Sequence, residues 1–314
     1  VKEGAFDSTP VIVDNVVYIG DLDGTIYALD LETGDEKWKK TFDTCFLAAA
    51  AVRDGLLFIG DIDGFVRCLD TSNGDLKWKY EAMAEIDSGA NFYGDNVLFG
   101  SQDATLYCVN AKSGKLTWTY EIADQIRCTP TVVEDRAFVA GCDGQLHIID
   151  LQKGESVGSV DIESPTGVTP AVLGQSAFFG TEAGAFFAVD WKAATTKWVF
   201  ADTKRGQAIR SSPAVSKDAA VFGSRGKRIY ALNPDSGKLL WEFPCRQRVD
   251  SSPVIVGKRV FVASADGRLY GLDVDSGKKQ WEFEAVGGFN GSPAVANKRL
   301  VIATDEGVVY CFGN

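Results

Sequence analysis

One sixteen-residue pattern returns along the whole chain at a nearly constant distance. "DGTIYALDLETGDEKW" at Asp23–Trp38 recurs as "DGFVRCLDTSNGDLKW" at Asp63–Trp78 and as "DGRLYGLDVDSGKKQW" at Asp266–Trp281. One position of the pattern serves as a phase marker, and it is occupied by Tyr27, Arg67, Tyr107, His147, Phe187, Tyr230, Tyr270 and Tyr310. Six of the seven steps between markers are 40 residues long and one is 43. A period of this size is typical of solenoids, propellers and arrays.

Other residue types keep the same phase. A Trp stands eleven residues after most markers and a Gly seven residues after them, as at Trp38 and Gly34. Between these anchors lie short segments rich in Val, Ile, Tyr and Thr, such as "PVIVDN", "VVYIGD", "TIYALD" and "WKKTF", which read as four strands separated by turns. We therefore expect an all-β, eight-bladed propeller of four-stranded antiparallel blades that forms one domain over residues 1–314. A blade cannot bury both faces alone, so the Trp and Gly residues are interpreted as packing between blades.

The register also predicts how the ring closes. Counting from Tyr310, the eighth blade takes three strands from the C-terminal end of the chain, "PAVANK", "LVIATD" and "GVVYCF". Only Val1 and Lys2 reach the end of its fourth strand, so we expect them to lie beside Tyr310. The native chain would then have upstream residues that complete this strand and protect its edge.

Composition excludes several classes of function. The net charge of -11 argues against nucleic acid as a partner, and no run of about 18 apolar residues could span a bilayer. Cys68, Cys108 and Cys311 share one strand phase and are expected to be small core residues. Cys128 and Cys142 would face each other if a hairpin turns at residues 134–135, so a disulfide is an alternative for an exported protein.

The motif "DGxLYALDxxxGKxxW" resembles the pyrroloquinoline-quinone-type (PQQ-like) propeller repeat, and the likeness covers practically the whole chain. That family contains quinoprotein dehydrogenases and also eight-bladed non-enzymatic members, such as the lipoprotein of the outer-membrane β-barrel assembly machinery. The resemblance implies a protein-binding scaffold in the periplasm or cell envelope, a monomeric propeller within a larger chain or complex. The alternative that it leaves open is a ligand-sensing or PQQ-binding propeller.

The residues favour a non-enzyme without cofactor or metal. Family quinoproteins clamp their cofactor with a vicinal disulfide, and no two Cys residues are adjacent here. Paired carboxylates such as Asp21 and Asp23 hint at a cation site, but Asp before Gly is more simply a turn. The one histidine, His147, takes a marker position and is interpreted as a packing residue. Trp191 falls outside the Trp phase, either by drift or as an exposed interface anchor.

Function should lie where the repeats differ, on the face that carries the loops leading into the first strands. We call this the top face. Twenty residues before each marker, at the mouth of the central channel, stand Asp7, Leu47, Asp87, Arg127, Gly167, Arg210, Asp250 and Asn290. Asp87 with Arg127, and Arg210 with Asp250, come from adjacent blades. They are expected to meet across the blade boundaries, either as ion pairs or as a polar mouth for a ligand or a partner's loop.

A second asymmetry of the top face is its charge. The only length change, three extra residues, lies in "FADTKRGQAIRSSP" between Trp198 and Pro213. We define the basic cluster as the cations that this loop and its neighbours bring to the top face: Lys204, Arg205, Arg210, Arg225, Lys227, Arg228, Arg246 and Arg248. The first three blades carry acids there instead: Asp21, Asp23, Asp43, Asp61, Asp63, Glu85, Asp87 and Asp103. A basic cluster on an acidic protein predicts a docking site for an acidic protein partner.

Overall fold

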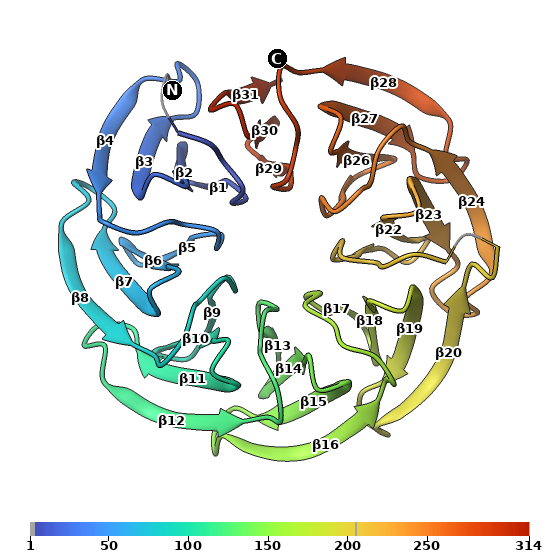
Figure 1. Ribbon diagram of the computed structural model, residues 1–314, viewed down its shortest axis with the longest axis horizontal. Helices are drawn as coiled ribbons and strands as arrows, with labels where there is room; N and C mark the ends of the chain where they lie inside the picture. Colours follow the sequence, from blue (N-terminus) through green and yellow to red (C-terminus); the bar gives the residue numbers. More distant parts are fainter. Residues whose placement is uncertain (1–3, 205, 314) are drawn as a thin grey trace.

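Each repeat folds into an antiparallel sheet whose strands follow one another from the central channel to the rim (Figure 1). The computed structural model describes residues 4–204 and 206–313. Within these ranges it contains strands and turns but no helix, and the sheets form a ring of eight blades. The prediction of an eight-bladed propeller is confirmed.

The strands that line the channel are the shortest of each blade, with two or three residues each. These inner strands are β1 (Val11–Val13), β5 (Ala51–Arg53), β9 (Asn91–Tyr93), β13 (Thr131–Val133), β17 (Ala171–Leu173), β21 (Ala214–Val215), β25 (Val254–Val256) and β29 (Ala294–Ala296). The second strands are β2 (Val16–Gly20), β6 (Leu56–Gly60), β10 (Asn96–Gly100), β14 (Arg136–Ala140), β18 (Ser176–Gly180), β22 (Ala220–Ser224), β26 (Arg259–Ser264) and β30 (Arg299–Ala303).

The third strands carry the phase markers. They are β3 (Thr25–Asp30), β7 (Phe65–Asp70), β11 (Thr105–Asn110), β15 (Gln145–Asp150), β19 (Ala185–Asp190), β23 (Arg228–Leu232), β27 (Arg268–Asp273) and β31 (Val309–Phe312). The outer strands are β4 (Glu36–Thr41), β8 (Leu76–Glu81), β12 (Leu116–Glu121), β16 (Glu155–Asp161), β20 (Thr195–Ala201), β24 (Leu239–Pro244) and β28 (Lys279–Glu284).

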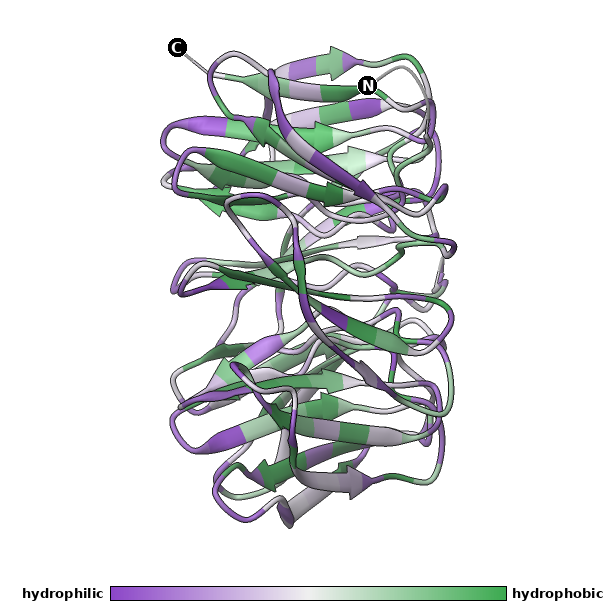
Figure 2. Ribbon diagram, turned by 90° about the vertical axis from the view of Figure 1, so that its left-hand side faces the viewer, coloured by the Kyte–Doolittle hydropathy of each residue, from purple (hydrophilic) through white to green (hydrophobic). Residues whose placement is uncertain are grey.

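The core lies between the blades rather than inside any one of them. Second and third strands are buried almost throughout, whereas outer strands alternate between exposed and covered positions. Hydrophobic segments accordingly occupy the strands, and hydrophilic residues gather at the loop tips on both faces (Figure 2). Each apolar cluster joins two successive blades, so every blade depends on its neighbours for burial.

The repeated Trp ties each blade to the next. The indole Nε1 of Trp38 donates to the carbonyl oxygen of Thr71 at 2.8 Å, and Trp241 donates to Val274 at 2.9 Å. The ring of Trp38 lies on the turn of the following blade at Gly74, where a Cβ atom would come within 2.7 Å of it. Gly74 also has a φ of 73°, so the turn needs glycine for both its backbone and its neighbour. Trp38 is the third residue of its outer strand, not the first as the sequence suggested.

The eighth blade differs from the rest because the structure describes only β29, β30 and β31 in it. Trp281, which faces this blade from the seventh, is 36% exposed, compared with 9% for Trp38 and 8% for Trp241. Cys311 is exposed as well, so the expectation that it is a core residue is wrong, whereas Cys68 and Cys108 are fully buried. The difference arises because no outer strand covers β31 among the described residues. The predicted neighbours of Tyr310, Val1 and Lys2, lie outside those residues.

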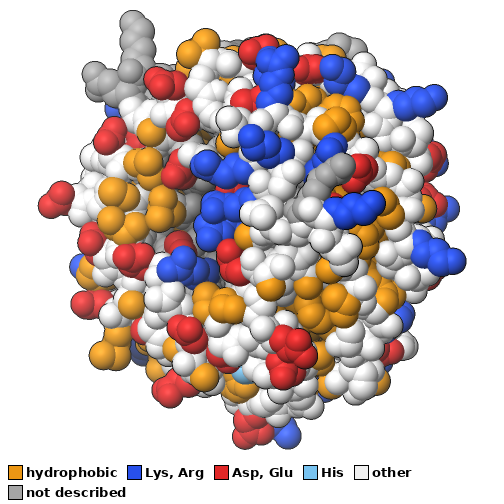
Figure 3. All heavy atoms as spheres, turned by 45° about the vertical axis from the view of Figure 1, so that its right-hand side comes forward, with side chains coloured by type: hydrophobic (Ala, Val, Ile, Leu, Met, Phe, Trp, Pro, Cys, Tyr) orange, Lys and Arg blue, Asp and Glu red, His pale blue; other side chains and the backbone are white. Residues whose placement is uncertain are grey.

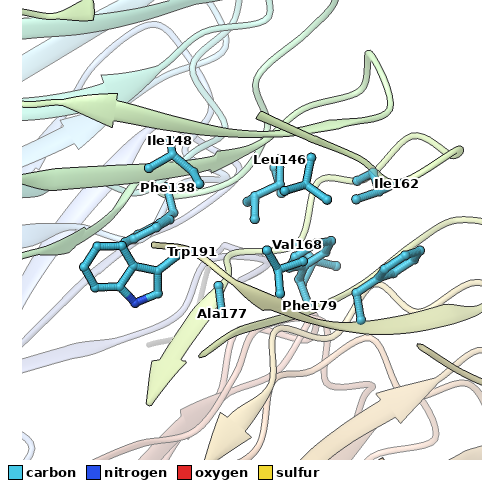
Figure 4. Packing of buried hydrophobic residues seen from close by; sticks show 12 residues of the cluster. Phe138, Leu146, Ile148, Ile162, Val168, Ala177, Phe179 and Trp191 are labelled. Carbon is cyan, nitrogen blue, oxygen red and sulfur yellow. The ribbon is translucent and has the colours of Figure 1, made fainter. Parts of the chain in front are cut away.

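The blades with irregular anchors are nevertheless well packed. Trp191 is buried, packs against Phe138 at 5.5 Å between ring centroids, and donates to the carbonyl oxygen of Gly174 at 3.0 Å (Figure 4). An exposed interface role for Trp191 is therefore wrong. It fills space where Gly158 replaces the usual Trp.

Candidate functional site: the channel mouth and its basic cluster

A belt of hydroxyl groups holds the inner strands together just below the mouth. Each hydroxyl accepts a hydrogen bond from the backbone N–H at the same position of the preceding blade, as Ser252 Oγ does from Ser212 at 3.0 Å. Five more backbone N–H groups make the same bond: Gly89 to Thr129, Thr129 to Thr169, Thr169 to Ser212, Ser252 to Ser292, and Ser292 to Thr9. The belt therefore passes from the eighth blade back to the first, and it gives the mouth a rigid base. It is interrupted between the first and third blades, because Ala49 of the second blade and Gly89 of the third carry no hydroxyl.

Two loops of each blade form the rim of the mouth. One, which we call the leading loop, runs into the inner strand. The other, the hairpin loop, connects the second and third strands. A backbone hydrogen bond joins them in every blade, for example from Arg225 N to Ala208 O at 3.0 Å. The position five residues before each marker, which makes this bond, thus projects beside the leading loop of the next blade.

This arrangement determines which side chains pair across blade boundaries. Arg210, on the leading loop of the sixth blade, binds both carboxylate oxygens of Glu182, on the hairpin loop of the fifth, at 2.8 and 3.2 Å. Asp250 in turn accepts two hydrogen bonds from Arg225 at 3.0 and 2.9 Å and one from Arg248 at 3.0 Å. Arg210 and Asp250 come from adjacent blades, as predicted, but they do not pair with each other. A nearer loop supplies each with a partner of opposite charge.

Asp87 and Arg127 likewise do not form a direct ion pair, which was one of the two alternatives for these positions. Gln102 lies between them, with Nε2 donating to Asp87 Oδ2 at 3.1 Å and Oε1 accepting from Arg127 Nη2 at 3.2 Å. The second carboxylate oxygen of Asp87, Oδ1, is buried and has no hydrogen-bond partner among the described residues. Burial raises the pKa of Asp87 to about 6, against the opposing charge of Arg127.

The mouth positions on the first and eighth blades meet as well. Asn290 Nδ2 donates to Asp7 Oδ1 at 2.7 Å, across the boundary where the two ends of the chain come together.

The basic cluster is only partly neutralised. Arg210, Arg225 and Arg248 have carboxylate partners, and the pairing with Asp250 raises the pKa of Arg225. Within the described residues, Lys204, Lys227, Arg228 and Arg246 have no ion pair, and Arg205 lies outside those residues. Lys and Arg side chains gather around the hollowed centre of the face shown in Figure 3. These unpaired cations are positive charges on the surface of a protein whose net charge is -11.

The acidic side of the top face is smaller than the sequence suggested. Asp21 and Asp61 are buried, and both belong to the interior of their hairpin loops. Asp21 accepts hydrogen bonds from Thr25 N at 2.7 Å and from Tyr27 Oη at 2.9 Å, and Asp61 pairs with Arg67 at 2.7 Å. These contacts support the turn interpretation of the Asp-x-Asp-Gly segments rather than a cation site. The described residues contain no group of three potential metal ligands.

His147 and the cysteines occupy structural positions. His147 Nε2 lies 2.9 Å from Asp143 Oδ2, and Nδ1 lies 3.2 Å from the hydroxyl of Tyr120, inside a buried blade boundary. Cys128 and Cys142 are both free thiols, and burial raises the pKa of Cys128 to about 12. The alternative of a disulfide between them is not found, because Cys142 turns toward the carbonyl oxygen of Thr166.

The comparisons with known proteins place the chain in a family. A sequence profile described as "Outer membrane protein assembly factor BamB" matches residues 2–200 and, in a second alignment, residues 126–314. The chain is a member of the BamB family. The resemblance to the PQQ-like repeat family is thereby confirmed. A search of curated proteins finds no sequence match to this BamB family chain.

Solved structures share the fold of this BamB family member at low sequence identity. BamB from Moraxella catarrhalis is 19% identical, with a TM-score of 0.84 over 98% of this chain and 96% of that one. The computationally designed Ika8 protein is 16% identical, with a TM-score of 0.87 over 99% and 96% of the two chains. Sqt1 from Saccharomyces cerevisiae is 13% identical, with a TM-score of 0.84 over 99% and 96%. At these identities the likeness shows the propeller fold alone.

The sequence alone missed two residues of the mouth, Gln102 and Glu182. Both stand five residues before a marker, in the hairpin loops, where the repeats differ as much as they do in the leading loops. That shared phase is the signal that would have identified them.

The structure describes no helix that is long and apolar enough to cross a membrane.

Proposed function

We propose that this BamB family member is a non-catalytic scaffold that docks an acidic region of another protein through its basic cluster and channel mouth. The family name, an outer membrane protein assembly factor, supports a role among protein partners in the cell envelope. The observation that carries the proposal is the set of unpaired cations on the top face: Lys204, Lys227, Arg228 and Arg246.

The geometry supports docking at this face rather than at the rim or the bottom. The hydroxyl belt joins the inner strands beneath the mouth, so the leading loops present their side chains from a rigid base. Arg225 and Arg248 are oriented by Asp250 and keep further N–H groups for a partner. Charged groups arranged in this way increase association rates and select partners of opposite charge.

A charge-reversal experiment tests the proposal. The triple variant Lys204→Glu, Arg205→Glu, Arg246→Glu changes only cations of the basic cluster. The matched control, Lys112→Glu, Lys153→Glu, Lys278→Glu, makes the same change in net charge at exposed lysines in the turns that precede outer strands. Lys204, Arg246 and the three control lysines are exposed, and such substitutions should change the free energy of unfolding by only about 0.5 kcal/mol per residue.

Both variants and the unaltered protein would be used to capture partners from cell-envelope extracts of the source organism. We expect one partner to be retained by the unaltered protein and by the control but lost from the top-face variant. Identical capture by all three proteins would contradict a docking role for the basic cluster.

A further inference from the structure

A pocket opens at the channel mouth, and Arg210 of the basic cluster lines part of it. It has a volume of about 460 Å³ and is formed by the third to sixth blades. Arg127 and Arg210 line its walls, and the buried residues Thr166 and Val168 form its floor. Gly167 leaves room for the side chain of Arg127, because a Cβ atom at position 167 would lie 3.1 Å from Arg127 Cβ.

Arg127 differs from the other mouth arginines in its partners. Its Nε donates to Gln125 Oε1 at 3.0 Å and its Nη2 to Gln102 Oε1 at 3.2 Å, and both acceptors are neutral amide oxygens. Arg210, Arg225 and Arg248 each bind a carboxylate, but among the described residues Arg127 binds none. A guanidinium carries five N–H donors, so Arg127 retains three for a ligand.

Arg210 faces the same pocket from the sixth blade. Glu182 occupies its Nε and Nη2 donors, which leaves Nη1 free. The two guanidinium groups therefore present unused donors to one hollow from two sides. Paired N–H groups of arginine match the geometry of a carboxylate, whose hydrogen bonds with arginine are among the strongest in proteins.

Two carboxylates line this pocket, Glu182 and Asp87. Glu182 is paired with Arg210, whereas Asp87 has no ion pair among the described residues. Gln102 and Arg127 face it from the third and fourth blades, Glu85 from its own leading loop, and the thiols of Cys128 and Cys142 from the fourth blade. None of these groups donates to the buried Oδ1 atom. When Asp87 is ionised, its negative charge competes with a bound anion for the positive charge of Arg127. When it is protonated the pocket gains one unit of positive charge.

We propose that this pocket binds a single carboxylate group, held by Arg127 with help from Arg210, and that ionised Asp87 opposes the binding. The proposal deepens the docking function and rests on it only for the source of the carboxylate, which can be an acidic side chain of a partner's loop or a free small acid. Gln102 is a positioning residue, because it holds Arg127 and Asp87 in fixed relation.

An NMR titration of the whole protein tests the site. Succinate supplies the free acid, and the capped peptide acetyl-Gly-Glu-Gly-amide supplies the side chain, while the backbone amide signals of Gly167 and Val168 report on the pocket. The variants are Arg127→Gln, which keeps hydrogen-bonding capacity but removes the charge, and Arg299→Gln, a control on the second strand of the eighth blade. Unchanged thermal unfolding of each variant shows that the fold is intact.

We expect saturable shifts at Gly167 that Arg127→Gln weakens by about tenfold or more, as for loss of a charge-assisted pair. Arg299→Gln should bind as the unaltered protein does. Affinity should rise severalfold from pH 7.5 to pH 5.5, and Asp87→Asn should abolish this dependence. Tighter binding of the peptide would assign the site to a partner's side chain, and tighter binding of succinate to a free acid.

The absence of saturable shifts at Gly167 with either probe, or equal binding by Arg127→Gln, would overturn the carboxylate site. The docking function would stand in that case if charge reversal at Lys204, Arg205 and Arg246 still abolished partner capture. Conversely, carboxylate binding without any partner capture would leave the pocket intact and remove the scaffold. The two failures are therefore distinguishable.

Discussion

Asn290 donates a hydrogen bond of 2.7 Å to the carboxylate of Asp7, although 283 residues separate them in sequence. Two more contacts cross the same boundary, from Ser292 N to Thr9 Oγ1 at 3.1 Å and from Phe6 N to Thr304 O at 3.2 Å. The hydroxyl contact repeats at most of the other blade boundaries, and the Phe6 contact is repeated at others, as from Phe46 N to Asp21 O, so the ring is closed at the channel much as neighbouring blades are joined elsewhere. Its closure depends on the first residues that the structure describes.

Truncation of Phe6 should therefore weaken the ring. Phe6 is fully buried between Tyr27 of the first blade and Val301 and Ala303 of the eighth. We expect Phe6→Ala to lower the free energy of unfolding by about 3–5 kcal/mol, as for other buried Phe side chains. Chemical denaturation measures this, with the exposed Val286→Ala as the control that should stay within about 0.5 kcal/mol. Removal of residues 1–6 should lower thermal stability at least as much, and a loss below 1 kcal/mol would contradict this closure.

The Trp contacts offer a second test with an internal control. Trp241 is buried and donates its indole hydrogen to Val274, whereas Trp281 is 36% exposed and has no acceptor among the described residues. Trp241→Phe should destabilise the protein by about 1–3 kcal/mol, because it leaves a buried carbonyl without its donor. Trp281→Phe should cost distinctly less. Equal losses in urea denaturation would mean that ring packing, and not the indole hydrogen bond, joins the blades.

The ionisation of Asp87 should make stability depend on pH. Burial raises its pKa in the folded state to about 6 from the ordinary value of 3.8, so the folded protein holds this proton more tightly than the unfolded chain. Its contribution to stability is therefore present below pH 4, is lost as the pH rises toward 6, and stays absent above.

Asp87→Asn removes this penalty. We expect the variant to be more stable than the unaltered protein by about 1–3 kcal/mol at pH 7.5, since one pKa unit corresponds to about 1.4 kcal/mol, and to match it at pH 4. Thermal unfolding at both pH values is the measurement, and Glu32→Gln at an exposed turn is the control. A variant that is less stable at pH 7.5 would show that the ionised form is well solvated.

Most of the fold could be predicted from the sequence because propeller blades repeat. The markers at constant spacing give the number of blades, and the Trp and Gly anchors predict which surfaces meet, as at Trp38 and Gly74. Departures from the pattern were harder to interpret. Because Trp191 lies outside the Trp phase, the sequence left open whether it was drift or an exposed anchor, and the structure shows that it is buried.

The sequence could locate residues of the candidate site but could not predict which of them pair. The leading loops predicted Arg127, Arg210 and Asp250 as mouth residues. Arg127 and Arg210 line one pocket, and Asp250 pairs with Arg225 of a hairpin loop. Their partners could not be predicted. Each charged side chain lies near two loops from different blades, and the backbone geometry decides which loop is near enough to supply the partner. Glu182 and Gln102 come from the hairpin loops, whose proximity to the next leading loop becomes visible only in three dimensions.

The salt dependence of partner binding tests the docking account most directly. The affinity of the captured partner would be measured across a range of ionic strengths for the unaltered protein and for Lys204→Glu, Arg205→Glu, Arg246→Glu. Screening weakens interactions between exposed charges, so the unaltered complex should weaken steeply as salt increases. The variant should bind at least about tenfold more weakly at low salt and should lose most of that dependence. Equal affinities at low salt, with parallel salt curves, would contradict the claim that this cluster docks an acidic partner.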